Sequence, residues 1–223
     1  LMLVQQKQNI KGFTLLELLV ILAIIGAIAG VGFPNFTKWS IDRELRAASE
    51  RIASILTSAT TQVERGIYPY ARITFSNGSK GPALNAWGVE QNDFSYYLNQ
   101  GNTLDCKHKD IVNASHQGTM FSSVELSEDV SIYHIMGGSI CFSKGGKYFK
   151  QEGTADTQGN VGFDNNKVAS NNVIVTCHKK ASSCDPINKV FDDKYPVYLV
   201  KYSRFGLIEK YKWSYADKVW KSR

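Results

Sequence analysis

The sequence lacks the short motifs that mark the commonest catalytic sites. It has no Gly-x-Ser-x-Gly elbow, no phosphate-binding glycine-rich loop ahead of a helix and no His-Glu-x-x-His helix. Its four histidines (His108, His116, His134 and His178) lie in polar loops, in one strand-like run and beside a cysteine. We expect a surface or structural role for each, because a catalytic histidine needs partners that the sequence does not bring near it. The sequence predicts neither an enzyme nor a cofactor.

Metal ligands are also sparse. A zinc site needs clustered cysteine and histidine, and only Cys177 and His178 are adjacent. Residues 156–166 offer oxygen ligands and glycines that calcium would accept, but their spacing departs from the EF-hand, and a solvated loop is the favoured alternative. We therefore predict no metal site.

The sequence has only a modest excess of positive over negative charge. The net charge of +6 is too small by itself to indicate a nucleic-acid-binding protein. The charge is unevenly spread, however, since residues 85–130 are mainly acidic and residues 194–223 mainly basic. The length of 223 residues suits one membrane helix and one soluble domain of about 150 residues.

One long apolar run is present, at residues 13–33, where only Thr14 and Glu17 are strongly polar. A helix of this length, at about 1.5 Å per residue, would cross the roughly 30 Å hydrocarbon core of a bilayer. A carboxylate such as Glu17 is costly there, which indicates a functional group with a partner elsewhere. A short basic leader ends at Gly12, ahead of the run, so a peptidase that cut after Gly12 would leave the apolar helix on the mature protein.

The sequence Gly12-Phe13-Thr14-Leu15-Leu16-Glu17 resembles the prepilin cleavage and methylation motif of type IV pilins and type II secretion pseudopilins. The resemblance implies cleavage after Gly12 by a prepilin peptidase and N-methyltransferase, and methylation of Phe13. It also implies assembly with other pilin or pseudopilin subunits at an inner-membrane platform, with Glu17 neutralising the amino terminus of a neighbouring subunit. The alternative is a plain signal anchor that carries an unusual glutamate.

After the long helix and an irregular segment come Ser131-Ile132-Tyr133, the hairpin segment at 140–146 and a closing segment at 202–207. This order is similar to that of the FimT/GspH group of minor pilins and pseudopilins, some of which bind DNA during uptake. The carboxyl-terminal stretch mixes cations with aromatic residues, as phosphate-binding surfaces do. The alternative is that the aromatic rings pack the sheet while the lysines keep its outer face solvated. Gly206-Leu207-Ile208-Glu209 stands where those DNA receptors carry two arginines. The candidate DNA-binding residues are Lys201, Arg204, Lys210, Lys212, Lys218, Lys221 and Arg223.

Lys7 and Lys11 precede the apolar run, and the positive-inside rule then places the amino terminus in the cytoplasm. The expected location is the inner membrane, crossed once in contact with lipid, with the carboxyl-terminal domain in the periplasm and later in a periplasmic or extracellular filament. Four cysteines in that oxidising compartment indicate two disulfides, for which three pairings exist. The short polar loop between Cys177 and Cys184 favours that pair, which leaves Cys106 with Cys141 by elimination.

The predicted fold class is α+β and pilin-like, with one long amino-terminal helix packed on an antiparallel sheet. Pro34 should kink the helix, and Gly66 should end it. A separate core helix or a coiled-coil stalk at residues 35–65 would bury the same apolar stripe. The expected parts are a cleaved leader at 1–12, a transmembrane and filament-core helix at 13–34, its amphipathic half at 35–66 and a globular sheet domain at 67–223.

Turn residues and alternating apolar residues divide the domain into expected strands. We predict a long loop at 81–105 with a short helix near 94–98, one strand at 124–135 and an exposed loop at 151–172. A hairpin should join 140–142 to 148–149. The other expected strands are 71–75, 173–177, 195–202 and 207–213, the last of which should end the sheet.

Overall fold

The structure is a computed structural model that describes residues 13–99, 118–134, 139–146 and 172–223. The chain forms two units, divided between Ser40 and Ile41. A single helix, α1 (Leu15–Glu64), contributes to both units.

The second half of α1 carries the apolar stripe that the sequence shows at spacings of three and four residues. Leu45, Ile52, Ala59 and Val63 lie on this stripe and are at most 1% exposed. Burying each large side chain contributes about 1.5–3 kcal/mol, so the stripe fixes the helix firmly in the domain. The helix ends before Gly66, whose φ of 74° suits a glycine at a helix carboxyl terminus.

Two antiparallel sheets make up the rest of the core. The first has the order β3-β2-β1-β5 and the second has the order β11-β10-β9-β6-β4. The first sheet contains β1 (Tyr70–Asn77), β2 (Pro82–Val89), β3 (Thr119–Glu125) and β5 (Ile140–Ser143). The second contains β4 (Val130–His134), β6 (Val173–His178), β9 (Tyr198–Tyr202), β10 (Ile208–Ser214) and β11 (Val219–Ser222). The smaller elements are α2 (Gln91–Asn99), the 3-10 helix η2 (Lys144–Gly146) and the ribbon of β7 (Cys184–Asp185) and β8 (Val190–Phe191).

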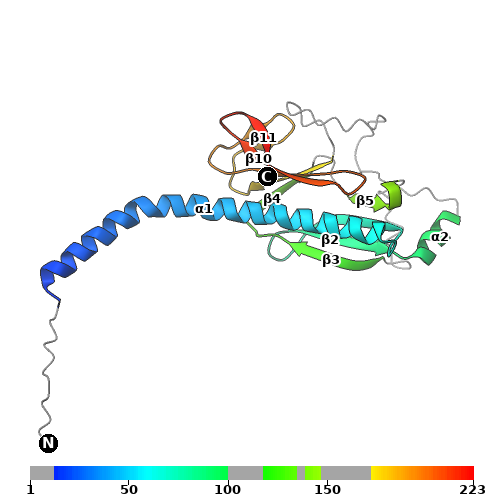
Figure 1. Cartoon of the computed structure of the whole chain (residues 1–223), viewed down its shortest axis with the longest axis horizontal. Helices are drawn as coiled ribbons and strands as arrows, with labels where there is room; N and C mark the ends of the chain where they lie inside the picture. Colours follow the sequence, from blue (N-terminus) through cyan, green and yellow to red (C-terminus); the bar gives the residue numbers. More distant parts are fainter. Residues whose placement is uncertain (1–12, 100–117, 135–138, 147–171) are drawn as a thin grey trace, which may run out of the picture. The chain divides into compact units, whose positions relative to one another are not determined.

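The second half of α1 runs between the two sheets and packs on both (Figure 1). The outer face of the second sheet forms another core, in which Trp213 and Trp220 pack under Phe191 of β8. Helix α2 packs at one end of the first sheet, where the Phe94 ring stacks on Tyr70. The predicted α+β class is therefore confirmed, but the helix is held by two sheets instead of one.

Three strand predictions were wrong in detail. Residues 82–89, expected in a loop, form β2, which pairs with β1 along its whole length. The single strand expected at 124–135 is two strands in different sheets, because the chain crosses from one sheet to the other at Leu126–Asp129. The strand at 207–213 is not the last, since β11 follows it and pairs with it.

Several sequence predictions lie outside the described residues. These are the leader with Gly12, the expected strand at 148–149, the candidate calcium loop and the side chains of Cys106, His108 and His116.

Candidate functional site

The amino-terminal motif begins a helix in a specific way. Phe13 and Thr14 precede α1, and the Thr14 hydroxyl oxygen accepts a hydrogen bond of 3.2 Å from the Glu17 amide. Thr14 is thus the amino-terminal cap, and Glu17 stands three residues later, at the acidic position of a capping box. A negative charge in the first turn is also favoured by the helix dipole. The Thr-x-x-Glu spacing could have indicated this cap from the sequence alone.

The side chains that follow form an apolar surface on the first part of α1. The large apolar residues from Phe13 to Ile28 are between 40% and 78% exposed within the chain. Further along, Phe36 and Trp39 form a ring pair with centroids 5.8 Å apart. Apolar surface on this scale marks a site that another apolar phase or another protein covers.

Among the helices in the described ranges, none is long and apolar enough to qualify as a membrane span. Helix α1 is continuous across Pro34, and the kink expected there remains a prediction.

Cys177 and Cys184 form a disulfide, with Cα atoms 6.3 Å apart. This bond ties the end of β6 to β7, beside the core under Phe191. Cys141 is also disulfide-bonded. Its pairing with Cys106 remains a prediction, since Cys106 lies outside the described residues.

Three of the seven candidate DNA-binding residues are engaged with carboxylates. Lys201 lies 3.2 Å from Glu209, Lys212 binds Asp42 and Lys221 binds Asp217. Arg204 instead lies over the Phe205 ring, 4.5 Å from its centroid. The set is completed by Lys210, Lys218 and Arg223. Three of the seven candidates therefore form internal ion pairs, and the other four contribute to a basic surface.

Asp42 is the centre of the contact between α1 and the carboxyl-terminal strands. Its carboxylate accepts hydrogen bonds from the Lys212 ammonium and, at 2.9 Å, from the Tyr198 hydroxyl. Burial alone would raise the pKa of Asp42, but these hydrogen bonds and the charges of Lys212 and Arg223 outweigh it and lower the pKa. Burial first, and then the bond to Asp42, raise the pKa of Tyr198. Asp42 is therefore ionised and Tyr198 is neutral near neutral pH.

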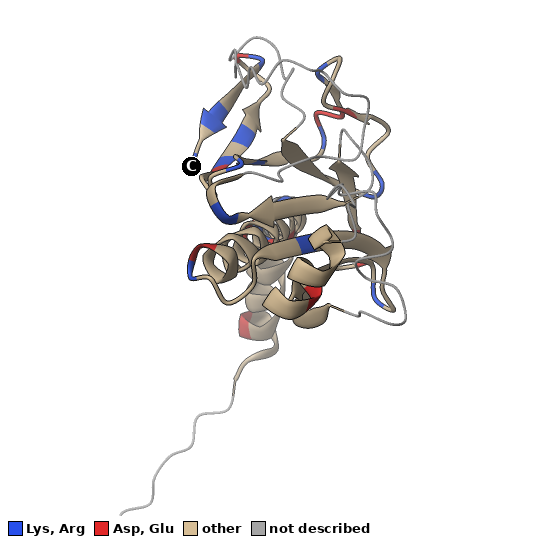
Figure 2. Cartoon of the chain, turned by 90° about the vertical axis from the view of Figure 1, so that its right-hand side faces the viewer, with Lys and Arg blue, Asp and Glu red and all other residues tan. Residues whose placement is uncertain are grey.

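Two pairs of cations face each other across β10 and β11. Lys212 is the direct cross-strand partner of Lys221, and the Arg223 amide donates to the Lys210 carbonyl at 3.0 Å. Lys and Arg segments lie on both strands, near the carboxyl end of the chain (Figure 2). We call Lys210, Lys212, Lys221 and Arg223 the cationic face.

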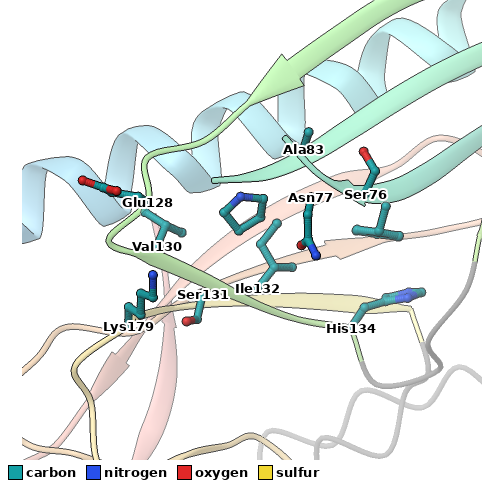
Figure 3. Close-up of a pocket in the computed structure, with 11 residues that line it drawn as sticks. Ser76, Asn77, Ala83, Glu128, Val130, Ser131, Ile132, His134 and Lys179 are labelled. Carbon is teal, nitrogen blue, oxygen red and sulfur yellow. The ribbon is translucent and has the colours of Figure 1, made fainter. Parts of the chain in front are cut away.

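A groove of about 560 Å³ lies between the end of the β1–β2 hairpin and β4 (Figure 3). Glu128 and Lys179 lie at one end, and His134 lies at the other. The His134 ring stacks on Phe75, and its Nε2 lies 3.0 Å from the Tyr202 hydroxyl. These contacts give His134 a structural role, as the sequence predicts.

His178 is buried and is likewise used in packing. Its ring stacks on Tyr195 with centroids 4.6 Å apart, and its Nδ1 accepts a hydrogen bond from the Lys180 amide. Within the part of the chain that the structure describes, no group of three or more histidine, cysteine, aspartate or glutamate side chains could hold a metal ion.

Comparison with known proteins identifies the amino-terminal segment. Residues 7–33 match the model of the prokaryotic N-terminal methylation motif. The chain is 27% identical to the type IV major pilin protein PilE of Neisseria gonorrhoeae over 75% of its own length and 93% of that protein. The chain is type IV pilin-like.

A fimbrial protein of Pseudomonas aeruginosa is 30% identical over 56 residues, which cover 25% of this chain and 36% of that relative. The match to these fimbrial proteins therefore covers little more than a third of their length. No solved structure matches the chain significantly. The pilin-family relatives that the chain matches are structural subunits and not enzymes.

Proposed function

We propose that this chain is a minor pilin or pseudopilin, a structural subunit of a type IV pilus or a type II secretion pseudopilus. A prepilin peptidase cleaves it after Gly12 and methylates Phe13. Residues 13–34 then hold it in the inner membrane, with the domain in the periplasm, until an assembly platform adds it to a filament of pilin or pseudopilin subunits. Glu17 neutralises the amino terminus of the neighbouring subunit during that step.

One observation carries the proposal. The exposed apolar part of α1 lies within the residues that match the methylation motif, and its first turn contains Glu17. The Phe36–Trp39 ring pair adds support, because aromatic residues are enriched where a membrane helix leaves the hydrocarbon core.

The mature amino terminus tests the processing step. Intact-mass and terminal-peptide analysis of membrane-extracted protein, from cells with an active prepilin peptidase, should find N-methylated Phe13 as the first residue. A Gly12→Val variant should keep its leader, whereas a Gly26→Ala variant, changed at a glycine with open space around it, should be processed normally. Leader retained on the unaltered protein would refute the proposal.

Filament incorporation tests the role of Glu17. We expect Glu17→Ala to be cleaved and anchored normally but to be largely absent from sheared filaments. Equal incorporation of Glu17→Ala and the unaltered subunit would contradict the assigned role.

The alternative is a minor pilin that acts as a DNA receptor in DNA uptake. It is favoured by the two cation pairs that face each other across β10 and β11. Duplex DNA should then bind with an affinity that falls steeply between two salt concentrations. Lys210→Gln should weaken binding, with Lys80→Gln on the first sheet as the matched control. Absence of any shift at micromolar protein would remove this alternative.

A further inference from the structure

The cationic face brings several like charges together on β10 and β11. Like charges directly opposite each other in an antiparallel sheet are destabilising, and here Lys212 lies opposite Lys221. Two residues away along β10, the Lys210 carbonyl accepts a hydrogen bond from the Arg223 amide, so a second pair of cations lies nearby. Lys218, in the turn between β10 and β11, adds a fifth cation. Among the residues that the structure describes, Asp42 and Asp217 form ion pairs with this group, through Lys212 and Lys221. The net charge of this cluster is therefore positive.

The cationic face is tied to a residue of α1 that follows the apolar run by a short length of chain. The Lys212 ammonium binds Asp42, and the Lys212 Nζ and the Arg223 Cζ lie 5.4 and 5.9 Å from the centroid of the Tyr198 ring. Asp42 follows Phe33 by nine residues of α1, which is about 14 Å at the usual rise of a helix.

We propose that the cationic face binds anionic phospholipid headgroups at the membrane surface and holds the domain there before assembly. This inference rests on the membrane anchor of the proposed function. An anionic leaflet attracts nearby lysines and arginines without directed contacts, over a distance of roughly a Debye length, about 8 Å at physiological salt. DNA is the less favoured partner, because two of the four cations are already engaged by carboxylates and are less available to phosphates that need directed contacts.

The test uses the full chain in vesicles of phosphatidylcholine, alone or mixed with phosphatidylglycerol in a two-to-one ratio. Lysines are acetylated briefly, and the rate at each lysine is read by mass spectrometry. Lys210, Lys218 and Lys221 should react at least about twofold more slowly in the anionic vesicles, and high salt should abolish the difference. Lys80 and Lys144, which belong to the first sheet and its turns, should react equally in both.

Matched variants sharpen the result. In Lys218→Gln/Lys221→Gln, the reporter Lys210 should lose most of its protection, whereas Lys80→Gln/Lys144→Gln should leave that protection intact. Equal acetylation in the two kinds of vesicle would overturn the inference. The inference would also be overturned if duplex DNA, added to neutral vesicles, protected the same lysines as strongly as the anionic lipid does. Failure of the chain to float with neutral vesicles would instead refute the proposed membrane anchor.

Discussion

Replacing Asp42 by alanine should weaken the domain markedly, because this carboxylate joins α1 to β9 and β10. Asp42→Ala leaves the hydroxyl of Tyr198, a residue only 2% exposed, without its acceptor, which costs about 1–3 kcal/mol. It also removes the ion pair to Lys212. The Lys212 and Asp42 side chains are 28% and 30% exposed, so this partly buried pair contributes about 1 kcal/mol. We therefore expect the free energy of unfolding to fall by about 2–4 kcal/mol.

Thermal unfolding of the full chain in detergent, followed by near-ultraviolet circular dichroism of its four tryptophans, measures this effect. For a domain of this size the loss corresponds to a fall in Tm of about 5–15 °C. Glu50→Ala is the matched control on the same helix, since Glu50 pairs with Arg46 in solvent, where such a pair contributes at most about 0.5 kcal/mol.

A double variant separates the two causes. Tyr198→Phe alone should cost about 1 kcal/mol, because the freed carboxylate can still bind Lys212 and water. Asp42→Ala/Tyr198→Phe should then be no less stable than Asp42→Ala, since no hydroxyl is left unsatisfied. If Asp42→Ala and Glu50→Ala lowered Tm equally, Asp42 would not be the junction that the geometry indicates.

Four further outcomes follow from named contacts. Folding lowers the pKa of Asp42, so the contribution of this carboxylate to stability is complete above the pKa of the unfolded chain and is lost as the pH falls through the folded-state pKa. The Tm advantage of the unaltered protein over Asp42→Asn should therefore shrink below about pH 4. Thr14→Ala should speed hydrogen exchange of the Glu17 amide by about fivefold, and Thr14→Ser should not. Replacing both Cys177 and Cys184 by serine should cost about 2.5 kcal/mol in denaturant unfolding. Gly206→Ala should lower Tm, because Gly206 has a φ of 81° and its new Cβ would meet Thr60 at 3.0 Å.

The long helix and much of the β-structure could be predicted because the relevant signals are local. The stripe through Leu45 and Ile52 has helical spacing, and Gly66 ends it where the backbone needs a positive φ. The strand β6 is a short apolar run buried on both faces, which its sequence also indicates. The methylation motif is contiguous, so its residue types and their order are enough to identify it.

The features that were missed depend on distant partners. The strand β2 contains proline and glycine and few β-branched residues, and it is a strand because it pairs with β1 on one side and β3 on the other. The pairing of Asp42 with Lys212 joins residues 170 positions apart. No local pattern indicates such a contact, so the sequence alone grouped Lys212 with the candidate DNA-binding residues.

The cap at Thr14 changes how a substitution of Glu17 must be interpreted. A carboxylate in an apolar run is costly, but in the first turn of a helix it lies near the unpaired amides and the positive end of the dipole, which offset part of that cost. Glu17→Ala therefore removes both a negative charge that the helix dipole favours and the charge offered to a neighbouring subunit. Thr14→Ala weakens only the helix start. If Thr14→Ala subunits enter filaments normally while Glu17→Ala subunits do not, the defect lies in assembly and not in the fraying of α1.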